Sequence, residues 1–105
     1  MNTRGVLLGS VNYEFPQIYP KPGWVEHDPE AIWASALKGI RGVFRRGLCK
    51  PAEVACIGIT NQREPSLLWE RRSGKPLGNA IVWQCRRTAS FCEGLRKKGL
   101  EPMVR

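Results

Sequence analysis

The segment from Asp28 to Gly47 constrains the fold of this chain most strongly, because it carries every signal of a long amphipathic helix. Asp28 can cap the first turn, Pro29 suits the first helical position, and Glu30 lies at the positive end of the helix dipole. The apolar residues that follow recur at helical spacing: Ile32, Trp33, Ala36, Leu37, Ile40, Val43 and Phe44. Gly47 suits the end of the helix. We therefore predict a helix over residues 29–46 with one apolar face.

The other predicted elements give an α/β chain. Val11, Tyr13 and Phe15 alternate with polar residues, which indicates a strand in the N-terminal segment. The full set is a strand within 1–17, a proline-stiffened connector at 16–23, strands at 54–59, 67–70 and 80–83, a turn at 71–76, and a closing helix at 88–98. The continuously apolar run at 54–59 is typical of a strand buried on both faces. This order predicts a mixed sheet with packed helices.

Composition and charge limit the class of protein. The 105 residues, 42% of them hydrophobic and 25% charged, are typical of one small globular domain or part of a larger one. Lys and Arg give a formal net charge of +8, but they lie in short groups at helix ends and turns, including Arg86 and Arg87, so we expect a solvated surface. A membrane span needs about 18 consecutive apolar residues, and no run in this sequence is nearly that long. The apolar run near the start is also too short for the core of a signal peptide. We expect no membrane partner and a cytoplasmic location.

Few residues of this chain can carry chemistry. Asp28 is the only aspartate, and no glycine-rich phosphate loop is present, so a kinase built from this chain alone would lack parts. His27 has no second histidine nearby, and we expect it to belong to a loop. The cysteines do not have zinc-site spacing, and we expect buried free thiols at Cys49, Cys56, Cys85 and Cys92. We predict neither a catalytic residue nor a metal ligand here.

The most informative segment is 57–64, I-G-I-T-N-Q-R-E, where an apolar strand runs directly into a polar cluster. Ligands of α/β sheets commonly bind just beyond strand ends. Arg63 and Glu64 supply a donor and an acceptor, which suits the hydroxyls of a polyol; a surface salt bridge or a turn is the alternative. Trp83 also follows a predicted strand, and it could pack on the C–H face of a small polyol or belong to the core.

Three segments in the same order resemble motifs of the FGGY carbohydrate kinases, and among them of the glycerol kinases. They are residues 19–29 (Y-P-K-P-G-W-V-E-H-D-P), 58–64 and 79–88 (N-A-I-V-W-Q-C-R-R-T). The resemblance covers nearly the whole chain, from about Gly5 to Arg105. It implies an actin-like, ribonuclease-H-like fold and an ATP- and Mg²⁺-dependent transfer of the γ-phosphate to the 3-hydroxyl of glycerol, which gives glycerol 3-phosphate.

The resemblance also implies roles for single residues. Arg63 and Glu64 match the pair that holds the glycerol hydroxyls, and Trp83 matches the residue that lines the glycerol carbon chain. Pro65 and Ser66 depart from the usual Thr-Thr, so the start of the next strand is expected to differ slightly.

Several parts of the family pattern have no counterpart in this chain. These are the opening strand and phosphate-binding hairpin, the catalytic Asp, a further Tyr ligand and the adenine-binding second domain. We therefore expect residues 1–105 to be an incomplete N-terminal domain with its first strands missing, which binds neither ATP nor Mg²⁺ alone. Expected partners are glycerol and the remainder of the kinase or a full-length homologue. The alternatives are a non-catalytic interaction protein with an exposed sheet edge, or a basic nucleic-acid-binding protein.

Overall fold

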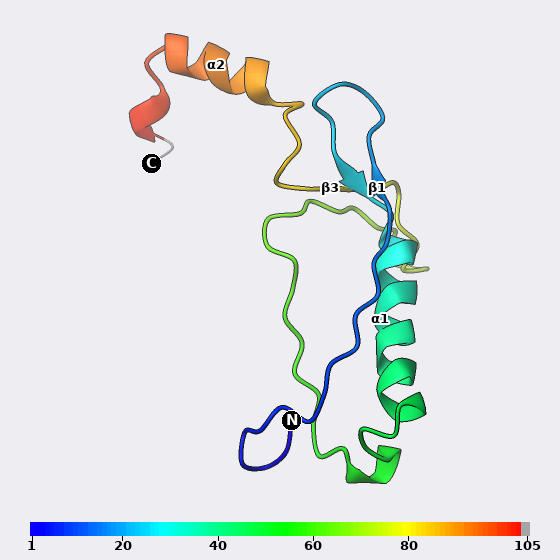
Figure 1. Cartoon of the computed structure of the whole chain (residues 1–105). Helices are drawn as coiled ribbons and strands as arrows, with labels where there is room; N and C mark the ends of the chain where they lie inside the picture. The colour runs from blue at the N-terminus through cyan, green and yellow to red at the C-terminus, as the bar shows by residue number, and fades with distance from the viewer. Residues whose placement is uncertain (104–105) are drawn as a thin grey trace.

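The structure is a computed structural model that describes residues 1–103 (Figure 1). Within this range the chain forms strands β1 (Gln17–Ile18) and β2 (Glu26–His27), helix α1 (Pro29–Arg45), the 3-10 helix η1 (Pro51–Glu53), strand β3 (Ala80–Ile81), helix α2 (Ala89–Lys97) and the 3-10 helix η2 (Glu101–Met103). Neither α-helix in this range is long and apolar enough to cross a membrane.

Helix α1 confirms the prediction for residues 29–46 to within one residue. Asp28 accepts a hydrogen bond from the Glu30 amide through Oδ1 at 2.9 Å, which satisfies a free N–H of the first turn. Gly47 ends the helix with a φ of 66°, a left-handed conformation that glycine adopts without strain. A methyl group on Gly42 would lie 2.9 Å from Val11 Cγ1, so this face of α1 packs closely on the N-terminal segment.

The three short strands form one antiparallel sheet in the order β1-β2-β3. Gln17 and Ile18 of β1 pair with His27 and Glu26 of β2, and Glu26 also pairs with Ile81 of β3. The combination of helices and strands is confirmed, but the described strands are all antiparallel, so the mixed sheet was wrong for this range. Strand β1 lies inside the predicted proline-stiffened connector, and it is an edge strand, where neighbouring prolines are tolerated.

Several predicted strands are absent or shorter in the described range. In the N-terminal segment, Val11, Tyr13 and Phe15 are half-buried and alternate with exposed residues, as the sequence pattern indicates. This segment nevertheless forms no strand. The segment 54–59 has no strand partner and is exposed: Ile57 is 70% and Ile59 is 92% exposed. The segment 67–70 keeps one bridge, between Trp69 and Pro76, and 80–83 shortens to β3. Apolar character favours a strand but does not supply the neighbour with which it pairs.

The closing helix predicted at 88–98 is confirmed as α2. Thr88 and Lys98 flank it, and Gly99 follows with a φ of 70°. Figure 1 shows α2 (orange) at the opposite end of the molecule from η1 (green).

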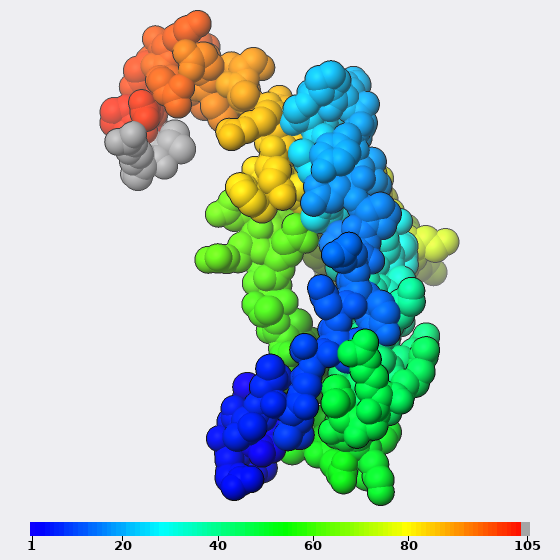
Figure 2. Space-filling model, in the orientation of Figure 1, coloured from blue at the N-terminus to red at the C-terminus, as the bar shows by residue number. Residues whose placement is uncertain are grey.

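The described residues have a very small core. Ala80 and Val82 are its buried apolar residues, at 4% and 3% exposure, and His27 is buried beside them at 5%. The radius of gyration is 19.2 Å, whereas a compact domain of this length has about 13 Å. Figure 2 shows the same elongated shape, with the C-terminal helices standing off from the rest. Burial is therefore concentrated around β2 and β3.

Candidate functional site

Strand β2 contacts both segments that carry the predicted site residues, one by pairing with β3 and the other through the side chain of His27. Glu26 and His27 are neighbours in an extended strand, so their side chains point to opposite faces of the sheet. Glu26 contacts Asn79, which precedes β3 in the sequence, and Arg87, which follows it. His27 contacts Gln62, which directly precedes Arg63.

The Glu26 carboxylate holds two donors that are distant in sequence. Arg87 donates from Nη2 to Oε1 at 2.5 Å, and Asn79 donates from Nδ2 to Oε2 at 2.9 Å. The side chains of Glu26 and Arg87 are only 14% and 18% exposed. The Arg87 guanidinium also lies over the ring of Trp24, 3.9 Å from its centroid, and donates from Nε to the sulfur of Cys85 at 3.0 Å. We call Glu26, Asn79 and Arg87 the carboxylate clamp.

These contacts change three proton affinities. The side-chain hydrogen bonds with Cys85 and Glu26 raise the pKa of Arg87. The hydrogen bond from Arg87, followed by that from Asn79, lowers the pKa of the Glu26 carboxyl, although partial burial opposes this. Burial raises the pKa of the Cys85 thiol, but hydrogen bonds from the Val25 backbone and from Arg87 together outweigh it, so the pKa lies below its ordinary value. The predicted solvated surface was therefore wrong for Arg87, which is half-buried and paired.

The carboxylate clamp makes the sheet sensitive to acid. Because the Glu26 pKa is lower in the folded chain, the stabilisation is fully present above its ordinary value of 4.5 and is lost as the pH falls below that value. In a pH titration followed by carboxyl ¹³C NMR, we expect Glu26 to have a midpoint below 4.5. Arg87→Gln should move that midpoint upward. A midpoint at or above 4.5 in the unmodified chain would contradict the clamp.

His27 was expected in a loop, but the structure places it in β2 and buries it. Its Nδ1 lies 3.3 Å from the Gln62 side-chain amide, and Phe15 meets the imidazole edge-on, with ring centroids 5.0 Å apart. Its buried Nε2 has no hydrogen-bond partner among the described residues. The single histidine therefore joins the N-terminal segment, the sheet and the polar cluster at 60–64.

The structure places Arg63 and Glu64 in an exposed bend beside β3. Glu64 has a φ of 67°, a left-handed conformation that is uncommon for residues other than glycine. Two residues later, Ser66 and Ile81 exchange backbone hydrogen bonds of 2.8 and 2.9 Å. Glu64 lies two residues before Ser66, and Trp83 lies two residues after Ile81, so both residues flank the same end of this antiparallel bridge. The backbone thus brings the two predicted segments side by side.

The predicted side chains themselves are accessible. Trp83 is 65% exposed, in a turn closed by a hydrogen bond from the Cys85 amide to the Val82 carbonyl at 2.9 Å. Arg63 and Glu64 are exposed, and within residues 1–103 no side-chain hydrogen bond or ion pair joins them to each other or to Trp83. The structure therefore brings the three residues into one region without direct contact between them.

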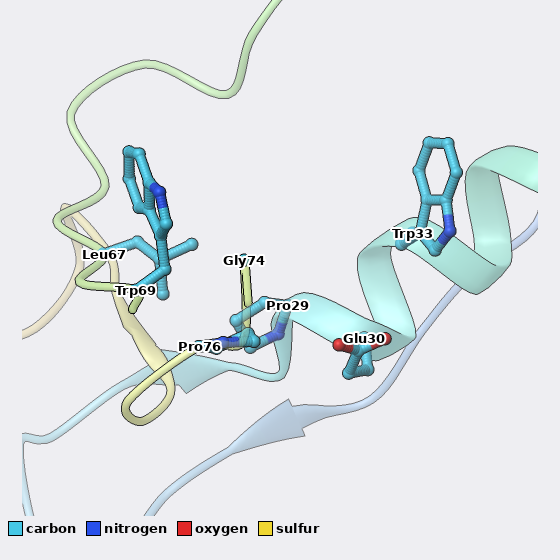
Figure 3. Close-up of a pocket in the computed structure, with 7 residues that line it drawn as sticks. All are labelled: Pro29, Glu30, Trp33, Leu67, Trp69, Gly74 and Pro76. Atoms are coloured by element: carbon cyan, nitrogen blue, oxygen red, sulfur yellow. The ribbon is translucent and has the colours of Figure 1, made fainter. Parts of the chain in front are cut away.

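A separate hollow of about 370 Å³ lies between the first turn of α1 and the segment 67–76 (Figure 3). It is lined by Pro29, Glu30, Trp33, Leu67, Trp69, Gly74 and Pro76, none of which belongs to the predicted site. In Figure 3 the rings of Trp33 and Trp69 stand on its two sides. Among residues 1–103, no three His, Cys, Asp or Glu side chains are grouped closely enough to hold a metal ion.

The cysteines are free, as predicted, but they are not buried. Cys49 and Cys85 are half-buried, whereas Cys56 and Cys92 are exposed. The described residues have a very small core, so these four small apolar side chains are not buried in it.

Sequence reasoning missed the carboxylate clamp and the role of His27. Both lie within the segments 19–29 and 79–88, which were recognised only as motifs. The signal available in the sequence was a carboxylate two residues after a tryptophan, followed much later by a pair of arginines, and this pattern is too general to predict a contact.

Comparison with known proteins identifies the family. Residues 1–105 match the N-terminal domain of the FGGY family of carbohydrate kinases. The glycerol kinase of Caldanaerobacter subterraneus subsp. tengcongensis is 54% identical over 101 residues, which are 96% of this chain and 20% of that protein. That of Carboxydothermus hydrogenoformans is 56% identical over 99 residues, 94% of this chain and 20% of that protein. Glycerol kinase 2 of Thermotoga maritima is 50% identical over 102 residues, 97% and 21% respectively.

The chain therefore spans about a fifth of the length of the curated relatives that it matches. The match extends over all three segments whose resemblance was noted from the sequence, and it confirms that resemblance. On this match and these identities, the chain belongs to the FGGY family of carbohydrate kinases.

Proposed function

We propose that this chain supplies part of the glycerol site of a glycerol kinase, which transfers the γ-phosphate of ATP to the 3-hydroxyl of glycerol. The observation that carries the proposal is the 50–56% identity to glycerol kinases over nearly the whole chain. No comparable observation favours the interaction protein or the nucleic-acid-binding protein. Because the chain spans about a fifth of the length of these relatives, we assign the binding of ATP and Mg²⁺ to the rest of the enzyme. The rest of the enzyme is then the partner of this chain.

The proposed roles follow from the chemistry of the three exposed residues. The Arg63 guanidinium donates hydrogen bonds to glycerol hydroxyls, and the Glu64 carboxylate accepts hydrogen bonds from them. The Trp83 ring packs against the carbon chain. Phosphoryl transfer depends mainly on aligning the attacking hydroxyl with the phosphate, so residues that only hold glycerol contribute directly to the rate. Glu64 and Trp83 flank the same end of the bridge between Ser66 and Ile81, which supports a shared binding role.

We further propose that the complete enzyme has an actin-like, ribonuclease-H-like N-terminal domain. The apolar segment 54–59, which is exposed here, would then become a strand with neighbours on both sides. The family match and the antiparallel pairing around β2 are consistent with such a domain. The cytoplasmic location expected from the sequence stays a prediction.

A chimeric enzyme tests the function directly. The 101 residues of the Caldanaerobacter glycerol kinase that match this chain are replaced by the chain itself, and glycerol phosphorylation is measured with ATP and Mg²⁺. We expect the chimera to phosphorylate glycerol, because 54% identity preserves most contacts with the rest of the protein. The isolated chain should show no turnover, since it lacks the groups that bind and activate the phosphate donor.

The same replacement in the Carboxydothermus enzyme serves as a second host, and each unmodified enzyme is the control. Native mass and circular dichroism report whether each chimera is folded. Folded but inactive chimeras in both hosts would contradict the proposed function. Measurable turnover by the isolated chain would contradict the assignment of ATP binding to the rest of the enzyme.

A further inference from the structure

One carboxylate connects the two ends of the segment that carries Trp83. Asn79 precedes β3 and Arg87 follows the turn after it, and both donate to Glu26, one to each oxygen. Trp83 lies midway between these two anchors. A single side chain on the central strand therefore closes residues 79–87 into a loop of fixed span.

The backbone within this loop is held to the chain around β2 at two further points. The Val82 amide lies 3.5 Å from the Val25 carbonyl, and the Arg86 amide donates to the Gly23 carbonyl at 2.6 Å. Val82 is buried, whereas its neighbour Trp83 is 65% exposed. The position of the Trp83 ring is therefore set by the loop that carries it, because the ring itself has little packing of its own.

We propose that Glu26 is a positioning residue that, through Asn79 and Arg87, holds Trp83 in place to receive glycerol. The proposal rests on the proposed function for the identity of the ligand, but the effect of Glu26 on Trp83 stands without it. The structure assigns this role to Glu26 because, among residues 1–103, its carboxylate is the group that Asn79 and Arg87 share.

The carboxylate clamp is best matched by an ionised carboxylate. Asn79 and Arg87 each donate to a different oxygen of Glu26, whereas a carboxamide has one oxygen and one NH₂ donor group in these two places. In Glu26→Gln, the amide nitrogen would face Arg87 donor to donor, or would face Asn79, whose own amide would have to turn to accept from it. Arg87 would keep its contacts with Trp24 and Cys85 but would lose its counter-charge while half-buried, which is costly. The loop is then released at one or both ends.

Tryptophan indole resonances of the ¹⁵N-labelled 105-residue chain test this directly. The chain has four tryptophans, which are assigned by single Trp→Phe substitutions. For Glu26→Gln we expect the resonances of Trp24 and Trp83 to shift, with Trp33 and Trp69 unchanged. Glu26→Asp keeps two acceptors and should partly restore the original Trp83 position. Glu14→Gln, the same change at an exposed position, is the matched control and should move neither resonance.

A second variant covers the case in which Glu26→Gln unfolds the chain and all four resonances collapse together. Asn79 is exposed, and Asn79→Ala removes only one bond of the carboxylate clamp. We expect a smaller shift of Trp83 in the same direction, with Asn12→Ala as the matched control. If the Trp83 resonance does not shift in the folded variants, the proposal is overturned, whatever the Trp24 resonance does.

Kinetics of the chimeric enzyme separate this proposal from the function itself. Glu26→Gln should raise KM for glycerol about tenfold and leave KM for ATP unchanged, because only the glycerol side of the site moves. If the chimeras without this substitution are folded but inactive in both hosts, the proposed function is contradicted, while the shift of Trp83 would still support the positioning role. Unchanged glycerol kinetics in an active chimera would overturn the positioning role and leave the function standing.

Discussion

Replacing Arg63 by alanine in the chimeric enzyme is expected to lower kcat/KM for glycerol about 100-fold, with little change in KM for ATP. A hydrogen bond to a charged donor contributes about 1.5–3 kcal/mol, and removing the donor also leaves the glycerol hydroxyl that it bound without a partner. A loss of this size converts to a factor of about 10 to 100 in kcat/KM. Initial rates at varied glycerol and fixed saturating ATP give the number.

Two further variants show whether the fork of Arg63 or only its charge is needed. Arg63→Lys keeps the charge but loses the planar pair of donors, so we expect an intermediate loss. Arg72→Ala removes an equally exposed arginine from the turn at 71–73 and should leave the kinetics unchanged. If Arg63→Ala changes kcat/KM less than threefold, or raises KM for ATP instead, Arg63 does not hold glycerol.

The helices of this chain could be predicted closely because their signals are local. Asp28, Pro29 and Gly47 mark the ends of α1 within the sequence itself, and the structure shows the cap and the left-handed stop that those residues favour. The end of α2 at Gly99 follows the same rule. A helix satisfies its own backbone hydrogen bonds, so no distant segment has to be known.

The strands could not be predicted in the same way. The run at 54–59 has the composition of a buried strand, but the described residues provide no neighbour for it. Strand β2, in contrast, consists of Glu26 and His27, two residues without strand propensity, and it forms because Ile18 and Ile81 pair with Glu26 from either side. Pairing across long sequence separations decides where a sheet forms, and composition reports it poorly.

The candidate site was predictable only where its residues are neighbours in sequence. Arg63 and Glu64 stand out because they belong to a polar cluster that follows an apolar run, and the bridge that joins their segment to β3 was not visible. The pair of Glu26 with Arg87 spans 61 positions, and that of His27 with Gln62 spans 35. The sequence indicated the groups that we propose to bind glycerol, whereas the contacts of Glu26 and His27 became visible only in the fold.

The largest expected effect on structure is at His27. His27→Ala removes one of the few buried side chains in the described range and should cost about 2 kcal/mol or more, as for other large-to-small changes in a core. That loss corresponds to about 30-fold faster amide exchange in the surrounding sheet. Hydrogen exchange by NMR at the Ile81 amide, which donates to Ser66 across the bridge, measures it.

A second substitution separates the packing of His27 from its contact with Gln62. His27→Phe fills the same space beside Phe15 and buries no unpaired nitrogen, but it cannot bond to the Gln62 amide. We therefore expect exchange at Ile81 to stay slow, while the backbones of Arg63 and Glu64 become more mobile in ¹⁵N relaxation because their segment loses its anchor. Equal acceleration at Ile81 in the alanine and phenylalanine variants would show that the polar contact, and not the volume, stabilises the sheet. Unchanged ¹⁵N relaxation at Arg63 and Glu64 in the phenylalanine variant would show that Gln62 does not hold the bend. Since the same bend carries the proposed glycerol ligands, these two readings decide whether the interior of this small sheet and its binding residues are physically coupled.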